Sequence, residues 1–379
     1  MPLPGEGRIN CQVTAGRLHQ TTESAYPLKI ISPQAAPNAN IDGHERDGGN
    51  LHPAVNYILS YGGGIVHGDR IHINVQVGRG CALLVLTQGS TKVFRHRRHG
   101  QPDVDNRSFS ALKQSDSSRI DCNSNATTTT DQSYQTMLID VAPGSLACLL
   151  PDPVTCFEGA MYNQRQAVRL HDAQSSSLVL LDWMTSGRMS RGERWAFGKY
   201  FSVNVVSVLD NFKHKQRDSL SEIAASAGSY DADWINESRI IIRDALLLNS
   251  QENSDGGSGG HWPAGRSYSF AQRLASVDVF AYLLILGPAV ANVADLFRKQ
   301  HLDQRIRPFR PSNQQSKLED EDESGIAWSV SEVDELGVKG VAVRVAGPDT
   351  EYVKSWIKRR LVSLQCVIGD SAWSMYYNA

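Results

Sequence analysis

The stretch YGGGIVHGDRIHINVQVGRGCALLVLTQGSTK, residues 61–92, carries the clearest indication of the fold. In residues 70–77, isoleucine or valine occupies every second position, which is typical of a strand with one buried and one solvated face. The Gly-Arg-Gly of residues 78–80 predicts a turn. Residues 81–86 form a continuous apolar run, which suits a strand covered on both faces. We therefore predict a hairpin in which an alternating, edge-like strand precedes a central one.

Further short apolar segments, separated by Gly, Pro, Asn and Asp, predict more strands along the chain. The candidates are residues 136–141, 146–150, 167–171, 178–183, 200–209, 239–248, part of 268–286, and 338–345. No fixed repeat period is visible among them. The pattern predicts a mainly β protein whose sheets stack on one another.

Two helices are expected in the C-terminal part of the chain. The first spans residues 288–301 and begins with Pro288, a residue favoured at the first helical position. The second spans residues 349–364, with Asp349 as a candidate N-cap. Its apolar positions form one stripe: Val353, Trp356, Ile357, Leu361 and Leu364. We interpret this stripe as core packing, with a partner-binding face as the alternative.

Four polar or Gly/Ser-rich segments interrupt the strand pattern. They are residues 35–50, 101–133, 253–260 and 312–325, the last with an acidic run at 319–323. None of them can bury much apolar surface, so we expect mobile insertions. Because none marks a clean boundary, we predict a single domain over residues 1–379.

Composition and charge argue against several classes of function. Lys plus Arg is 38 and Asp plus Glu is 40, a formal net charge of −2, which gives no general reason to expect nucleic acid or an anionic membrane as partner. Residues 1–10 carry no secretory signal, and the apolar stretch 279–293 is too short to span a bilayer. The six cysteines form no C-x-x-C pair, so we interpret them as buried free thiols. A soluble intracellular protein is expected.

No catalytic motif emerges from the sequence. The glycines Gly62, Gly63, Gly64 and Gly68 lack the order of a phosphate-binding loop, and a strand rather than a helix is predicted to follow them. The motifs H-E-x-x-H and G-x-S-x-G are absent. Consecutive glycines permit positive φ and close backbone approach, so we interpret this block as architecture.

Two polar features could bind a ligand. His67 and Asp69 could offer a nitrogen and an oxygen to Ni²⁺, but two groups do not complete a site. A turn in which Asp69 is hydrogen-bonded to the backbone is the simpler interpretation. Residues 94–99 are basic and could bind an anion or nucleic acid, although a solvated loop is preferred. The absence of a catalytic constellation points toward a scaffold or binding protein.

Several blocks resemble, in order, the signature motifs of the UreD (UreH) family of urease accessory proteins. They are YILSYGGGIVHGD (57–69), LTQGSTKVF (86–94), LPDPVTCF (150–157), LDW with TSGR (181–188) and RGERW (191–195). The matching positions are Tyr61, Gly62, Gly63, Gly64, Gly68, Asp69, Thr87, Gln88, Lys92, Pro151, Pro153, Gly187, Arg188, Gly192 and Glu193. The insertions at 101–133 and 253–260 resemble those of a fungal-type member.

The resemblance implies a cytoplasmic, non-catalytic protein with stacked β-sheets in a β-helix-like arrangement and about two α-helices. Its implied partners are a UreF-like accessory protein, a UreG-like GTPase and apo-urease, with no nucleic acid and no membrane. No cofactor would be tightly bound, because Ni²⁺ would be in transit through a water-filled tunnel. The candidates for that path are His67, Asp69, Asp152, Glu158, Asp182 and Glu193. An ordinary turn or salt-bridge role is the alternative for the acidic residues.

Two other functions stay open at this point. One is an enzyme with an unrecognised site near Asp182 to Glu193, which would require a deep closed pocket with convergent His, Asp or Glu side chains. The other is a nickel-binding storage protein, which would require tight binding of Ni²⁺ by the isolated chain. The few clustered His and Cys residues argue against storage.

Overall fold

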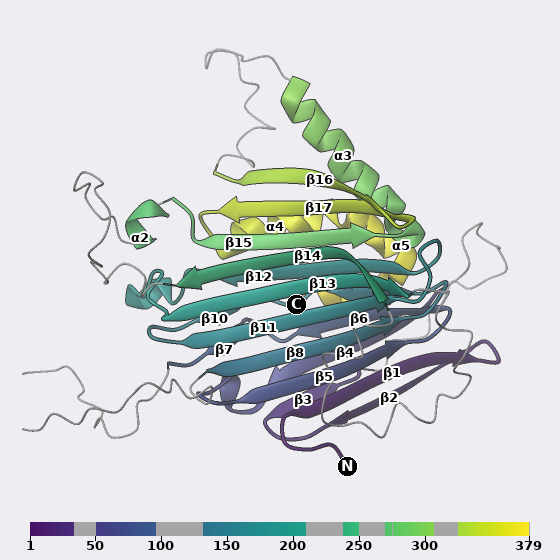
Figure 1. The fold of residues 1–379 in the computed structure, drawn as a ribbon, viewed down its shortest axis with the longest axis horizontal. Helices are drawn as coiled ribbons and strands as arrows, with labels where there is room; N and C mark the ends of the chain where they lie inside the picture. The colour runs from purple at the N-terminus through teal and green to yellow at the C-terminus, as the bar shows by residue number, and fades with distance from the viewer. Residues whose placement is uncertain are drawn as a thin grey trace, which may run out of the picture.

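The computed structural model describes residues 1–33, 51–95, 132–209, 238–249, 270–274, 276–306 and 325–378. These residues form two stacked β-sheets, with helices packed on the outer face of the larger sheet (Figure 1). The smaller sheet runs in the order β14 (Ser238–Asn249), β13 (Lys199–Leu209), β11 (Met161–Leu170), β8 (Ser133–Val141), β5 (Arg70–Val77), β1 (Glu6–Thr14) and β2 (Arg17–Ser24). The larger sheet runs in the order β16 (Ala327–Glu335), β17 (Val338–Gly347), β15 (Val279–Leu286), β12 (Ser177–Thr185), β9 (Leu146–Leu149), β6 (Cys81–Thr87), β4 (His52–Ser60) and β3 (Leu28–Ile31). Two short strands, β7 (Thr91–Val93) and β10 (Val154–Cys156), extend it.

From β4 to β13 the main strands alternate between the two sheets. β4, β6, β9 and β12 lie in the larger sheet, whereas β5, β8, β11 and β13 lie in the smaller one. Successive strands of one sheet pair in parallel, and antiparallel pairs occur toward the sheet edges. The predicted mainly β fold with stacked sheets is therefore confirmed. The more specific β-helix-like arrangement stays a prediction.

The predicted hairpin of residues 70–86 is wrong, although both of its strands exist. β5 pairs with β1 and β8, and β6 pairs with β4 and β9, so the two strands lie in different sheets. Nor is β5 an edge strand. The turn at 78–80 crosses between the layers: Gly78 donates its N–H to the carbonyl of Cys11 at 2.8 Å, and a Cβ there would lie 2.6 Å from that oxygen. A local pattern gives the face of a strand but not its partner.

Two apolar cores explain why strands of the larger sheet are buried on both faces. Inward side chains such as Leu83 and Leu180 pack between the sheets, whereas Leu84 and Leu181 pack beneath the helices. All nine residues of β12 are buried. This confirms that β6 is a central strand covered on both sides, as its continuous apolar run predicted.

The helical content exceeds the expected two helices. Five α-helices occur in the described part of the chain: α2 (Phe270–Arg273), α3 (Ala291–Ile306), α4 (Thr350–Arg360), α5 (Gln365–Ile368) and α6 (Asp370–Tyr377). The two expected helices correspond to α3, which follows a 3₁₀ turn at Pro288–Val290, and α4. The helices α2, α5 and α6 are too short to give a recognisable apolar period.

The predicted cap and stripe of α4 are both confirmed. The carboxylate of Asp349 accepts a hydrogen bond from the backbone N–H of Tyr352 at 3.0 Å. The stripe from Val353 to Leu364 is buried in the core beneath the larger sheet, as the core-packing interpretation requires.

The cysteines only partly fit their interpretation as buried thiols. Cys11, Cys81, Cys148 and Cys156 are buried and free, whereas Cys366 is exposed. Cys122 and the predicted insertions at 35–50, 101–133, 253–260 and 312–325 lie outside the described residues, except Gln132, Ser133 and Gly325 at their ends. None of the described helices is long and apolar enough to cross a lipid bilayer.

Candidate functional site

The passages from the larger to the smaller sheet all lie at one end of the molecule, which we call the crossover rim. They share this end because β4, β6, β9 and β12 run parallel to one another, as do β5, β8, β11 and β13. The described part of the rim comprises residues 61–69, 88–95, 150–160 and 186–198, with β7 and β10 toward the left in Figure 1. The return passages at the opposite end are the short turns 78–80, 142–145 and 171–176.

The rim brings together the sequence blocks that matched the family motifs. Tyr61 to Asp69 form one passage, and Gln88 and Lys92 lie on the next, directly after Thr87 at the end of β6. The third passage carries Pro151 and Pro153, and the fourth carries Gly187, Arg188, Gly192 and Glu193. Blocks that are more than a hundred residues apart in sequence therefore share one surface.

Backbone hydrogen bonds join these passages side by side. Ile65 forms a parallel bridge with Val93 of β7, and β7 pairs in parallel with β10. The N–H of Thr91 donates to the carbonyl of Pro153 at 3.0 Å, and the N–H of Phe157 donates to that of Val93 at 2.9 Å. β10 in turn pairs with the end of β12. The rim is a continuous backbone network rather than a set of separate loops.

Two motif glycines allow close approach within this network. A Cβ on Gly64 would lie 2.5 Å from the carbonyl oxygen of Lys92, and a Cβ on Gly187 would lie 2.1 Å from that of Glu193. Real Cβ atoms do not approach backbone oxygens so closely. These contacts fit the architectural interpretation of the glycine-rich blocks.

Arg188 and Glu193 form a paired group on the fourth passage. The Nε of Arg188 donates to Glu193 Oε2 at 2.7 Å, and its second nitrogen donates to Oε1. The Arg188 guanidinium lies 3.9 Å from the ring centre of Phe157, and the backbone N–H of Glu158 also donates to Glu193. The hydrogen bonds from Arg188 lower the pKa of Glu193.

Asp69 stabilises the first passage. Its carboxylate accepts a hydrogen bond from the backbone N–H of Val66 at 2.9 Å, which is the predicted turn interaction. Burial raises the pKa of Asp69. The passage is fixed to β8 by a hydrogen bond from the Ser133 hydroxyl to the Val66 carbonyl at 2.8 Å. His67 lies two residues from Asp69 in the same turn.

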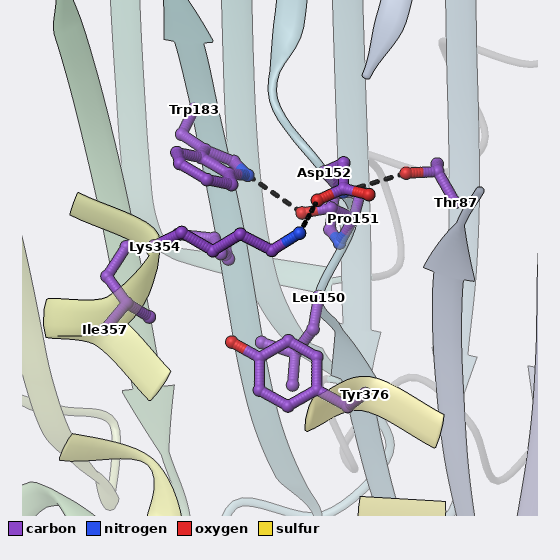
Figure 2. Close-up of a pocket in the computed structure, with 9 residues that line it drawn as sticks. Thr87, Leu150, Pro151, Asp152, Trp183, Lys354, Ile357 and Tyr376 are labelled. Carbon is purple, nitrogen blue, oxygen red and sulfur yellow. Dashed lines mark hydrogen bonds and ion pairs between the residues drawn. The ribbon is translucent and has the colours of Figure 1, made fainter. Parts of the chain in front are cut away.

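Asp152 lies where the rim meets the helices, beside a cavity of about 10 Å³ that has room for about one water molecule. Figure 2 shows Lys354 of α4 reaching toward it, and the ion pair measures 2.7 Å. The Asp152 N–H donates to the Thr87 hydroxyl at 2.8 Å, and the Trp183 indole donates to the Pro151 carbonyl at 2.8 Å. The two groups of the ion pair are largely buried, which fixes α4 to the third passage.

Asp182 lies on β12 and faces the interior between the sheets. Its carboxylate accepts hydrogen bonds from Gln164 at 2.9 Å, Ser202 at 2.6 Å and Asn204 at 2.7 Å. Burial raises the pKa of Asp182, and these hydrogen bonds oppose that rise. Its hydrogen-bond donors are neutral, unlike those of Asp152 and Glu193.

A larger cavity of about 440 Å³ adjoins Asp182 where the larger sheet extends past β14. Asp244, Tyr282 and Arg344 also line it, and Arg344 donates to Asp244 at 2.5 Å. The sequence analysis missed these three residues. The signal that could have revealed Asp244 is an acidic residue at an inward position of a predicted strand.

The candidate residues therefore separate into two places. His67, Asp69, Asp152, Glu158 and Glu193 lie on the rim, whereas Asp182 lies in the interior. Glu193 is not among the described residues that line the Asp182 cavity, so the two ends of the proposed 182–193 enzyme site do not converge. Within the described ranges, no group of three or more His, Cys, Asp or Glu side chains is arranged to hold a metal ion.

The fold and the rim define a two-sheet β protein in which distant sequence blocks meet at one end. The chain belongs to the UreD urease accessory protein family, whose sequence profile matches residues 5–373.

Individual relatives support this assignment over most of the chain. The chain is 28% identical to urease accessory protein 4 of the fungus Cryptococcus neoformans var. grubii, covering 98% of this chain and 94% of the relative. It is 28% identical to urease accessory protein D of Oryza sativa subsp. japonica, with 97% and 94% covered. The UreD protein of Sorangium cellulosum is 27% identical, with 98% and 83% covered.

Proposed function

We propose that this chain is a non-catalytic scaffold in urease maturation. In this role it acts in the cytoplasm with UreF-like and UreG-like proteins and helps deliver Ni²⁺ to apo-urease. The observation that carries the proposal is the family match over residues 5–373. Relatives from a fungus, a plant and a bacterium bear the name urease accessory protein, which supports a shared role in maturation.

Asp182 is the strongest candidate for contact with Ni²⁺ in transit. Asp152 and Glu193 are each paired with a cation, and these pairs offset their negative charge. Asp182 accepts hydrogen bonds from two side-chain amides and a hydroxyl. All three donors are neutral, so none of them carries a positive charge that offsets the charge of the carboxylate. Asp244 also lines the cavity beside Asp182 but is paired with Arg344, so Asp182 is the one of these two carboxylates whose hydrogen-bond donors are all neutral. A single such carboxylate suits passage rather than storage, because a tight site needs several converging ligands.

A deletion strain tests the proposed function. We expect urease to be present at a normal level but to lack nickel and activity, as measured by metal analysis of the purified enzyme. Full nickel content in urease from the deletion strain would overturn the proposal. Equilibrium dialysis of the isolated chain separates delivery from storage, because storage requires retained, stoichiometric Ni²⁺.

The variant Asp182→Asn tests the transit residue. It removes the charge and keeps the size of the side chain, so we expect a several-fold lower nickel content of urease at low external Ni²⁺, with recovery at high Ni²⁺ by mass action. Asp334→Asn changes an exposed carboxylate and serves as the control. Equal nickel loading by both variants, at equal protein levels, would remove Asp182 from the path.

A further inference from the structure

The crossover rim and the strand ends beside it expose several large apolar side chains. They are Leu3 (64% exposed), Tyr26 (71%), Tyr61 (49%), Val66 (47%) and Met189 (52%). They come from four separate parts of the sequence, and the parallel pairing of β1 with β5 together with the antiparallel pairing of β1 with β2 brings all four to the same end of the sheets. Clustered exposed apolar side chains are typical of a protein-binding surface.

Local contacts hold the first part of this group together. The rings of Tyr26 and Tyr61 lie 5.7 Å apart, and the Lys29 ammonium lies 5.8 Å from the Tyr61 ring centre. The backbone N–H of Tyr61 donates to the Pro27 carbonyl at 2.8 Å. The N–H of Gly5 donates to the carbonyl of Tyr26 at 2.9 Å, which positions Leu3 nearby. The two tyrosines are therefore presented in a fixed arrangement.

The exposed charges around these side chains are mainly basic. Lys92, Arg95 and Arg191 are exposed on the described rim passages, and Glu158 is the exposed acidic residue there. On the neighbouring strands, Lys29 of β3 and Arg70 of β5 are exposed, as is the acidic Glu23 near the end of β2. The whole chain carries a formal net charge of −2, so this basic character is local to the rim.

We propose that the crossover rim is a docking surface for a folded protein partner that presents acidic side chains around an apolar centre. Apolar contact with Tyr61 and Val66 would supply affinity, and the surrounding cations would favour an acidic surface and speed its approach. The backbone network of the passages keeps this surface ordered before binding, which reduces the entropic cost of association.

This inference rests on the proposed function for the choice of partners to be tested. The purified full-length chain is titrated by calorimetry with purified UreF-like protein and, separately, with apo-urease. Tyr61→Ala and Val66→Ser test the apolar contact, and Lys92→Glu combined with Arg191→Glu tests the charge. The matched controls are Leu302→Ser, at an exposed position of α3, and Arg17→Glu, at the start of β2 on the end of the sheets opposite the rim.

We expect Tyr61→Ala to weaken binding of at least one of the two partners by about tenfold or more, because truncating an aromatic residue at the centre of an interface often has an effect of this size. The double charge reversal should weaken it several-fold, with a larger effect at about 50 mM than at about 300 mM salt because of screening. Leu302→Ser and Arg17→Glu should bind within about twofold of the parent chain. Equal melting temperatures show that each variant is folded.

Three results would overturn the inference in distinguishable ways. Normal binding by the rim variants would show that the partner docks elsewhere, while leaving the proposed function intact. No binding of either partner by the parent chain would overturn both. Tight binding of a short RNA or DNA duplex that the charge reversal abolishes would identify the rim as a nucleic-acid surface instead.

Discussion

Three acidic side chains that the sequence places among the same candidates have different partners in the fold. Asp152 pairs with Lys354 of a distant helix, Glu193 pairs with Arg188 five residues earlier, and Asp182 is held by neutral donors. Each carboxylate is largely buried, so its partner decides what its charge can do. The first two have a structural role, and the third faces the interior cavity.

The variant Lys354→Met should destabilise the protein by about 3 kcal/mol, because it leaves the Asp152 carboxylate buried without its cation. Urea unfolding measures the loss. Adding Asp152→Asn to this variant should recover part of it. Lys339→Met is the control, since Lys339 is 75% exposed and lies 3.9 Å from Asp334; it should cost less than about 1 kcal/mol. Equal stability of the two single variants would contradict this role for Asp152.

Glu193 should give the protein a pH-dependent contribution to stability. Its pKa in the folded chain is below the ordinary value of 4.5, because Arg188 favours the charged form. The stabilisation is therefore present above about pH 4.5 and is lost as the pH falls through the lower, folded value. We expect Glu193→Gln to be less stable than the parent at pH 7 and the difference to shrink below pH 4.5, as measured by urea unfolding. A pH-independent difference would contradict this.

At the scale of elements, β7 and β10 show how short strands depend on their surroundings. Each has three residues, and each is stabilised by pairing with a neighbouring passage of the rim. Gly64 lies against β7, where it leaves room for the carbonyl oxygen of Lys92. The packing of this glycine and the pairing of the passages are therefore coupled.

The variant Gly64→Ala should destabilise the protein by about 1–3 kcal/mol, since its Cβ would force β7 away from the first passage. The backbone of Gly64 is extended, with φ of 168°, so the cost comes from the close approach and not from the backbone angle. In the control Gly62→Ala the added Cβ meets no neighbouring atom, but residue 62 has a left-handed φ of 78°. This control therefore measures the cost of the backbone conformation alone. Hydrogen exchange in residues 91–93 should rise only in Gly64→Ala.

The sequence pattern predicted the elements that are marked by local features, such as apolar periodicity or a capping residue. The alternation of residues 70–77 gave β5, and Asp349 with its apolar stripe gave α4. The pairing of β5 with β1 and β8 could not be predicted, because hydrogen bonds to distant strands leave no mark on the local pattern. The same holds for β7 and β10, which are too short to show a period.

The residues of the candidate site could be predicted from the sequence, whereas their contacts with distant elements could not. The motif blocks identified the residues of the rim, and the topology then placed them together. Lys354, which pairs with Asp152, and Asp244 and Arg344, which line the cavity beside Asp182, come from other elements, so their positions depend on how the sheets and helices pack. Only the fold could show which carboxylates have a cation beside them.

For the whole molecule, the two-core arrangement predicts an uneven distribution of stability. β12 is covered by the smaller sheet on one face and by helices on the other, whereas β2 forms a sheet edge. Hydrogen exchange followed by mass spectrometry should show the slowest exchange in residues 177–185 and fast exchange in residues 17–24. Comparable rates in these two segments would mean that the molecule opens as one unit.

The connections at the two ends of the sheets differ in length, and this difference decides which insertions the fold can accept during evolution. An added residue in the turns 78–80, 142–145 or 171–176 would shift a strand by one position and exchange its inward and outward faces. Passages that cross the rim can lengthen between the anchored strands without such a shift. New binding preferences can therefore arise at one end while the register of the sheets is preserved from the other.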